Sequence, residues 1–214
     1  MNTDSVKYIP VLAKEGIKHE IGGRGERGKL LVPDSTEANL NALQLIVDIY
    51  EYDDPIPCDT AYFDALKELR KDNILFKKDV KDHNLLGQSC FPPSKMRFKY
   101  LAGWDPDNLM TGTYKGLPLS HAVIERGTNI KSFNLFLTTS LKHYPQHLGL
   151  LFQEDSSGKT AYERATEKHG KDAETINVIK KCIPTDTTIP ILHHVIRDAP
   201  QFINDFSIRY PSAT

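Results

Sequence analysis

The chain has 214 residues, a formal net charge of −1 and a pI near 6.7. Binding of DNA or RNA requires a basic face, and this even charge balance indicates none, so no nucleic-acid partner is expected. No stretch approaches the ~20 apolar residues that a membrane span requires, and the first residues lack the basic and apolar segments of a secretory signal. A cytoplasmic protein, which could also be nuclear, is therefore predicted.

The first 34 residues are interpreted as an N-terminal helix followed by a glycine-rich loop. Apolar residues at helical spacing predict a helix over residues 6–15, with Pro10 in its first turn and Gly16 as its C-cap. Residues 22–28 are rich in glycine and charge. Residues 29–33 are expected to be extended up to Pro33.

Residues 35–214 are interpreted as a series of helix pairs. The apolar run 40–49 fits a buried helix or a strand, and its length together with an N-cap at Thr36 or Asn39 favours the helix. A break is expected over residues 53–57, followed by an amphipathic helix over residues 60–71. Further helices are predicted over residues 79–90, 95–103 (with Ser94 as N-cap), 118–126, 132–143, 160–169, 172–182, 191–197 and 202–209.

Short segments recur along this series. Residues 116–122 (GLPLSHA), 158–165 (GKTAYERA) and 190–195 (PILHHV) each open a helix, and helices end alike at residues 103–106 (GWDP), 143–145 (HYP) and 209–211 (RYP). A period of this kind indicates a repeat architecture. The spacings between equivalent positions of successive helix pairs are unequal and require loop insertions of about ten residues. Such insertions are tolerated because closure entropy grows slowly with loop length.

These openers resemble the first helix of an ankyrin repeat. Gly116, Pro118, Leu119 and Ala122 match its Gly-x-Pro-Leu-x-x-Ala pattern, residues 155–162 resemble the preceding hairpin with its Thr opener, and residues 192–195 resemble its Leu-His core. Leu117 stands where threonine is usual. Ala161 and Tyr162 replace Pro-Leu, and Val195 replaces alanine. The resemblance to this divergent ankyrin-repeat-like family implies an all-α, ankyrin-like helical-repeat solenoid with short hairpin loops and four to five repeats over residues 35–214.

Several patterns suggest chemistry but have simpler interpretations. Gly23, Gly25 and Gly28 match Gly-x-Gly-x-x-Gly, yet no helix of useful length starts there to receive a pyrophosphate. His143 and His147 have metal-ligand spacing, but Pro145 between them ends the helix.

Other patterns in the sequence also have simpler interpretations. His193 or His194 could form an acid–base pair with Asp198, but a hydrogen bond to the local backbone is favoured for the histidine. Cys90 could act as a nucleophile, but burial at the end of an apolar helix is favoured. Trp104 could anchor a binding partner. Tyr144 and Tyr210 stand at the corresponding helix ends, however, and this favours a repeated structural role in which each aromatic ring caps its helix by packing under the next unit. Cys58, Cys90 and Cys182 form no Cys-x-x-Cys pair. No catalytic residue, cofactor or metal is expected.

The predicted function is non-catalytic protein–protein interaction or scaffolding. In a solenoid of this kind the hairpin tips and inner helices form a concave binding surface, and mixed charge there suits a protein partner. Alternatives from other classes are a small helical enzyme and a structural subunit of a larger complex. The residues predicted to contact a protein partner are Tyr114, Lys115, Glu125, Arg126, Asp155, Ser157, Glu163 and Arg197.

Overall fold

A computed structural model describes residues 3–23, 25–33, 35, 39–48, 55–91, 93–125, 130–169 and 178–179. The chain divides into two compact units, Met1–Gly116 and Leu117–Thr214. The described residues are mostly helical and include one small two-stranded hairpin, which confirms the helical fold class in its coarse form. The helices predicted over residues 172–182, 191–197 and 202–209 lie outside the described residues, apart from 178–179.

The N-terminal helices of the first unit are α1 (Thr3–Val6) and α2 (Ile9–Lys18). Pro10 lies in the first turn of α2, as predicted, because its missing N–H is not needed there. The prediction that Gly16 caps the helix is wrong. Gly16 lies inside α2, and a Cβ added to it would come within 2.7 Å of the Cα of Gly28, so a backbone-to-backbone contact requires a glycine here.

The glycine-rich loop forms turns, and the predicted extended segment 29–33 is also a series of turns. Arg27, Gly28 and Lys29 have φ angles of 47°, 63° and 67°, which no strand can accommodate. Arg27 fixes the loop by donating to the Ile74 carbonyl at 2.8 Å and to the Asp79 carboxylate.

Helix α3 (Ala42–Val47) confirms the helical interpretation of the run 40–49. Its N-cap is Asn41, not Asn39 or Thr36. The Asn41 side chain accepts from the Gln44 N–H at 2.9 Å, and the Gln44 side chain accepts from the Asn41 N–H at 3.0 Å. This reciprocal capping box satisfies two donors of the first turn.

Helix α4 (Pro55–Lys71) begins earlier than the predicted start at Thr60. Proline in a first turn loses no intrahelical hydrogen bond, so the proline-rich segment starts the helix instead of breaking it. The single helix predicted over residues 79–90 is two short helices, α5 (Lys77–Asp82) and α6 (Leu85–Gln88). They are separated at Asn84, whose φ of 50° interrupts helical geometry.

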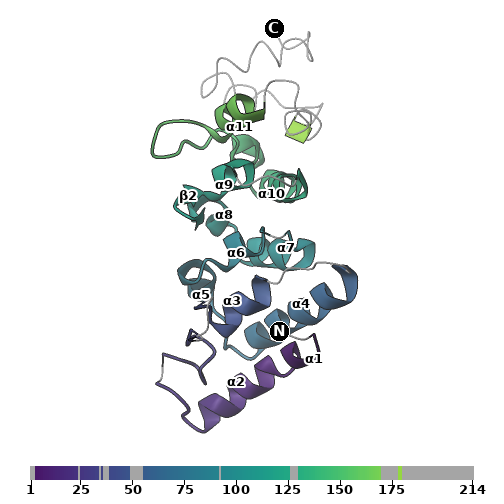
Figure 1. Ribbon diagram of the computed structural model, residues 1–214, viewed down its shortest axis with the longest axis vertical. Coiled ribbons are helices and arrows are strands. Elements are labelled where there is room, and N and C mark those ends of the chain that lie inside the picture. Colours follow the sequence, from purple (N-terminus) through teal and green to yellow (C-terminus); the bar gives the residue numbers. More distant parts are fainter. Residues whose placement is uncertain are drawn as a thin grey trace. The chain divides into compact units, whose positions relative to one another are not determined.

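Helix α7 (Lys95–Trp104) begins at the predicted cap, where the Ser94 hydroxyl accepts from the Arg97 N–H at 3.3 Å. Within the first unit α4 contacts α1, α2, α3 and α7, and this packing forms the core (Figure 1). The fully buried side chains here include Tyr62, Leu66, Leu69, Phe98 and Leu101.

Arg97 is buried within this core, and its guanidinium donates hydrogen bonds to three partners. Its Nε donates to Asp59 Oδ1 at 2.8 Å and to Ser94 Oγ at 2.7 Å, and its Nη1 donates to the Ile46 carbonyl at 2.6 Å. A buried cation requires such compensation. Arg97 thereby joins α3, α4 and α7.

Helix α8 (Asp107–Thr111) leads to strands β1 (Thr113–Tyr114) and β2 (Leu117–Pro118), which pair around Lys115 and Gly116. These two turn residues have φ angles of 51° and 81°. Positive φ at both central positions is what a two-residue hairpin loop requires.

The second unit contains α9 (Leu119–Glu125), α10 (Ile130–His143), the 3₁₀-helical segment η1 (Pro145–Leu150) and α11 (Ala161–His169). These elements confirm the helices predicted over residues 118–126, 132–143 and 160–169. Helix α9 contacts both α10 and α11 (Figure 1). Both α9 and α10 bury apolar side chains, among them Phe133, Phe136 and Leu137 of α10.

Candidate functional site

The turn between Glu154 and Thr160 is closed by the side chain of Asp155. Glu154 and Thr160 form an isolated antiparallel bridge, and Gly158 takes a φ of 75° between them. Asp155 Oδ1 accepts from the Ser157 N–H at 2.8 Å, the Ser157 hydroxyl at 2.6 Å and the Lys159 N–H at 3.2 Å. Asp155 was expected to be exposed at a hairpin tip, and it is buried because its carboxylate faces into the turn.

The start of α11 is capped by Thr160 and Glu163. The Glu163 carboxylate accepts from the Thr160 N–H at 2.9 Å, and the Glu163 N–H donates to Thr160 Oγ1 at 3.1 Å. This is a Thr-x-x-Glu capping box. The Glu163 side chain therefore has a structural task at the helix terminus.

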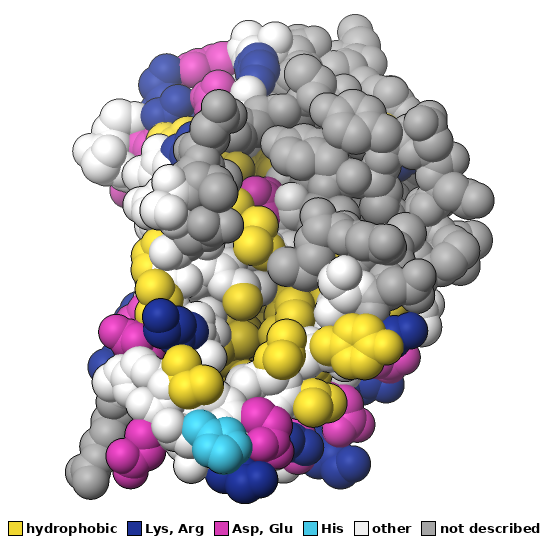
Figure 2. Space-filling model, turned by 60° about the horizontal axis from the view of Figure 1, so that its bottom comes forward, with side chains coloured by type: hydrophobic (Ala, Val, Ile, Leu, Met, Phe, Trp, Pro, Cys, Tyr) yellow, Lys and Arg dark blue, Asp and Glu magenta, His cyan; other side chains and the backbone are white. Residues whose placement is uncertain are grey.

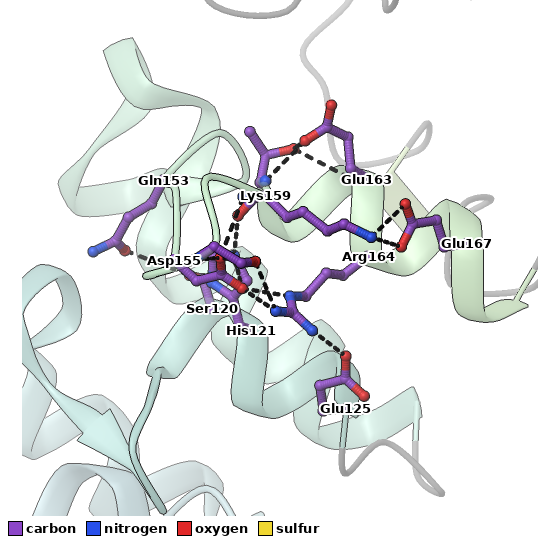
Figure 3. A network of polar contacts seen from close by, with 11 residues as sticks. Ser120, His121, Glu125, Gln153, Asp155, Lys159, Glu163, Arg164 and Glu167 are labelled. Carbon is purple, nitrogen blue, oxygen red and sulfur yellow. Dashed lines mark hydrogen bonds and ion pairs between the residues drawn. The ribbon is translucent and has the colours of Figure 1, made fainter.

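Arg164 connects three elements of the second unit (Figure 3). Its Nε donates to Asp155 Oδ2 at 2.5 Å, its Nη1 donates to Glu125 Oε1 at 3.0 Å, and its Nη2 donates to the Ser157 hydroxyl at 3.3 Å. The guanidinium fork thus bridges α9, the turn and α11, in the planar geometry that suits carboxylates.

His121 joins α9 to the same turn. Its Nε2 lies 2.8 Å from the Lys159 carbonyl oxygen, which can only accept, so Nε2 carries the proton. The unprotonated Nδ1 then accepts from the Ser120 hydroxyl at 3.1 Å. His121 is fully buried, so this neutral form agrees with its surroundings.

The charges of this cluster are fixed by their environment. Burial raises the pKa of Asp155, but hydrogen bonds from Ser157, Arg164 and the Lys159 N–H outweigh it and hold the pKa well below its usual range. Hydrogen bonds to Asp155 and Glu125 raise the pKa of Arg164. Burial lowers the pKa of His121 more than the Lys159 carbonyl and Asp155 raise it. At neutral pH the cluster holds an ionised carboxylate, a cation and a neutral imidazole.

Ser120, His121 and Asp155 have the residue types of a hydrolytic triad but not its arrangement. A triad needs an accessible hydroxyl and a carboxylate that orients the imidazole. Here the Ser120 hydroxyl is buried, and Asp155 Oδ2 lies 4.0 Å from an Nε2 that already donates to a carbonyl. The cluster holds the turn and two helices together.

The structure brings some of the predicted contact residues together and separates others. Glu125, Asp155 and Ser157 all contact Arg164. Tyr114 and Lys115 belong to the β1–β2 hairpin, where the half-buried Tyr114 ring lies 4.7 Å from that of Phe91 and Lys115 is exposed. Arg126 and Arg197 lie outside the described residues.

Sequence reasoning missed an exposed apolar face on α2. Tyr8, Val11 and Leu12 leave 55%, 54% and 66% of their surface exposed, and we call these three residues the α2 stripe. Figure 2 brings the α2 end of the first unit forward and shows hydrophobic side chains among charged ones on that face. The signal was present as the i, i+3 and i+4 spacing of these residues.

The chemical motifs recognised in the sequence are not assembled into sites in the described part of the chain. Gly23, Gly25 and Gly28 lie in turns, with no helix at the motif to receive a phosphate. His143 ends α10 and His147 lies in η1, so no single helix carries both. Burial raises the pKa of the Cys90 thiol, which opposes formation of a nucleophilic thiolate. No group of three or more potential metal ligands occurs among the described residues.

A hollow of about 490 Å³ lies between the end of α2 and the glycine-rich loop. The described groups with shifted pKa values lie elsewhere in the chain. The hollow is lined by Gly16, Ile17, Glu20, Ile21, Gly22, Gly23, Arg27 and Gly28.

Comparison with known proteins adds no relative. No protein-family model, curated protein or solved structure matches this chain. The ankyrin-like resemblance therefore stays a prediction. Within the residues that the structure describes, every helix is too short or too polar to cross a membrane.

Proposed function

We propose that this chain is a non-catalytic protein-binding module that docks a partner on the α2 stripe. The observation that carries the proposal is the exposure of Tyr8, Val11 and Leu12 on one helical face. Large apolar side chains grouped on a surface are typical of interaction sites, because their removal from water favours association by ~25 cal/mol per Å². Tyrosine is also enriched among the residues that dominate binding energy.

The finer fold that we propose is a divergent ankyrin-like solenoid. Two successive stretches of the chain support it, because their elements follow in the same order. The first stretch is α7, α8, the β1–β2 hairpin and α9, and the second is α10, η1, the bridged turn 154–160 and α11. The buried His121, which donates to the carbonyl of the following turn, supports it further, since a repeat must attach to its successor.

The described residues favour an interaction module over an enzyme. A catalytic pocket is expected to gather groups with perturbed pKa values. The hollow beside α2 has no such group in its lining, while His121 and Asp155 are buried in the turn cluster. A permanent structural subunit remains the second candidate, since the α2 stripe suits an obligate interface as well.

The test replaces Tyr8 and Leu12 by serine in the full chain. Proteins retained by the wild type and by the variant from native extract are compared quantitatively, with Met96→Ser, another exposed large apolar side chain, as the matched control. We expect a defined partner to be retained by wild type and by the control and lost from the double variant. Equal retention by all three would refute the assignment of the α2 stripe, and a partner that never dissociates from the wild type would favour a permanent subunit.

A further inference from the structure

A cluster of aromatic and cationic side chains lies across α4 and α7 in the first unit. We call Phe63, Lys67, Arg70, Tyr100 and Trp104 the aromatic–cation cluster. The Phe63 and Tyr100 rings meet edge to face at 5.3 Å, and the Tyr100 and Trp104 rings lie 6.5 Å apart. The guanidinium of Arg70 lies 4.4 Å from the Trp104 ring centre, and the Lys67 ammonium lies 4.6 Å from that of Phe63.

The cluster faces solvent. Lys67 and Arg70 are exposed, and the three aromatic side chains are half-buried. Phe63, Lys67 and Arg70 follow one another at i, i+4 and i+7 on α4, and Tyr100 and Trp104 are four residues apart on α7. Each set therefore lies on one side of its helix. Tryptophan, tyrosine and arginine are the residues most enriched at the centres of protein interfaces.

The exposed charge on α4 and α7 is positive although the whole chain carries −1. The exposed bases on the described parts of α4 and α7 are Lys67, Arg70, Lys71, Lys95 and Lys99. The exposed acids on the same helices are only Asp64 and Glu68, and they pair with Lys67 at 2.7 Å and Lys71 at 3.7 Å. Within the described residues no ion pair engages Arg70, Lys95 or Lys99.

Arg70 is therefore held in place while its donors stay available. A guanidinium that stacks on an indole ring keeps its N–H groups in its own plane, pointing past the edge of the ring. A carboxylate can approach that edge and accept two parallel hydrogen bonds. Because the stacking has already ordered the arginine, less conformational entropy is lost when the carboxylate binds.

We propose that the aromatic–cation cluster binds an acidic protein segment, with Arg70 donating hydrogen bonds to a carboxylate of the partner and Trp104 packing against its apolar side chains. This inference goes beyond the α2 stripe, concerns different residues and is tested separately. Nucleic acid is the less favoured occupant. Binding of a single strand relies on base stacking against open aromatic faces, and here Arg70 and Lys67 already lie over the rings of Trp104 and Phe63.

The experiment uses the intrinsic fluorescence of the full chain, because Trp104 is its one tryptophan and lies inside the cluster. The chain is titrated with a synthetic amphipathic peptide of glutamate and leucine, and in a second arm with the same peptide carrying lysine for every glutamate. A third arm uses oligothymidylate. We expect a saturable change of Trp104 emission with the glutamate peptide and not with the other two ligands. Added salt should weaken this binding, because it screens the charge pairing.

The variants separate the role of Arg70 from general positive charge. Arg70→Ala should raise the Kd for the glutamate peptide roughly tenfold. Arg70→Lys should recover only part of the lost affinity, because an ammonium lacks the planar fork of a guanidinium. Lys78→Ala, which removes an exposed lysine from α5, is the matched control and should leave the Kd unchanged. Circular dichroism checks that each variant is folded. An equal response to the lysine peptide, tighter binding of oligothymidylate, or an unchanged Kd in folded Arg70→Ala would each overturn the proposal.

Discussion

At the scale of single residues, the turn cluster makes the second unit sensitive to acid. The pKa of His121 is lowered, chiefly by burial, and the pKa of Asp155 is lowered because hydrogen bonds outweigh its burial. In each case the native state holds the proton less tightly than the unfolded chain does. Each group therefore stabilises the fold above its unfolded pKa, and this contribution is lost as the pH falls towards the native value.

We expect the free energy of unfolding to fall in two pH windows. The first opens below 6.5, the ordinary pKa of His121, and the second below 3.8, the ordinary pKa of Asp155. His121→Asn, whose amide can still donate to the Lys159 carbonyl, should remove the slope of the first window and leave the second. The measurement is urea unfolding at a series of pH values.

The comparison uses a background without the other described histidine whose pKa is lowered. Burial lowers the pKa of His143 as well, so both the variant and its parent carry His143→Gln. The prediction is wrong if the free energy of unfolding of His121→Asn still falls as steeply as that of its parent when the pH drops below 6.5.

At the scale of elements, α2 is attached through a contact between two glycines. A Cβ on Gly28 would come within 2.5 Å of the Ala13 carbonyl oxygen and 2.9 Å of the Ile17 nitrogen, both in the backbone of α2. Helix backbone cannot move aside as a flexible side chain can. The φ of +63° at Gly28 adds strain for any other residue.

Gly28→Ala should therefore destabilise the first unit by about 1–3 kcal/mol, as overpacked sites do. Gly103→Ala is the opposite case, since it lies in α7 with open space around its Cβ position, and it should stabilise by up to ~1 kcal/mol. Thermal or urea unfolding of both variants gives the two values. A Gly28→Ala variant as stable as wild type would show that α2 shifts freely against the loop.

The elements also show which boundaries sequence patterns can locate. Ser94 was recognised as a cap because it directly precedes an apolar helical run, and its hydroxyl bonds locally to Arg97. Asn41 was missed because Asn39 and Asn41 both suit an N-cap, and only the reciprocal contact with Gln44 decides between them. Gly16 was misassigned because its packing partner, Gly28, lies in a separate segment.

At the scale of the whole molecule, we expect the first unit to fold without the second. The buried side chains of α4 and α7 and the partners of Arg97 all lie within Met1–Gly116. Truncation after Gly116 removes β2, the partner strand of β1. We expect a chain of residues 1–116 to unfold cooperatively in urea, followed by Trp104 fluorescence and far-ultraviolet circular dichroism together. Transitions that do not coincide between the two probes would contradict this expectation.

The candidate sites depend on contacts that span longer stretches of sequence, which explains why sequence reasoning found only part of them. Asp155 was expected at an exposed tip, but it is buried because its carboxylate faces into the turn, where Arg164 of α11 also contacts it. Trp104 was noticed as a single residue. Its pairing with Arg70 becomes visible only when α4 lies against α7.

The attachment of α2 by backbone separates the residues that hold the helix from those that it displays. A Cβ on Gly16 or Gly28 would collide with backbone, whereas Tyr8, Val11 and Leu12 leave more than half of their surface exposed. Selection for folding alone would leave the stripe free to drift. A change of binding specificity could thus accumulate on this helix one substitution at a time, while the fold beneath it stays the same.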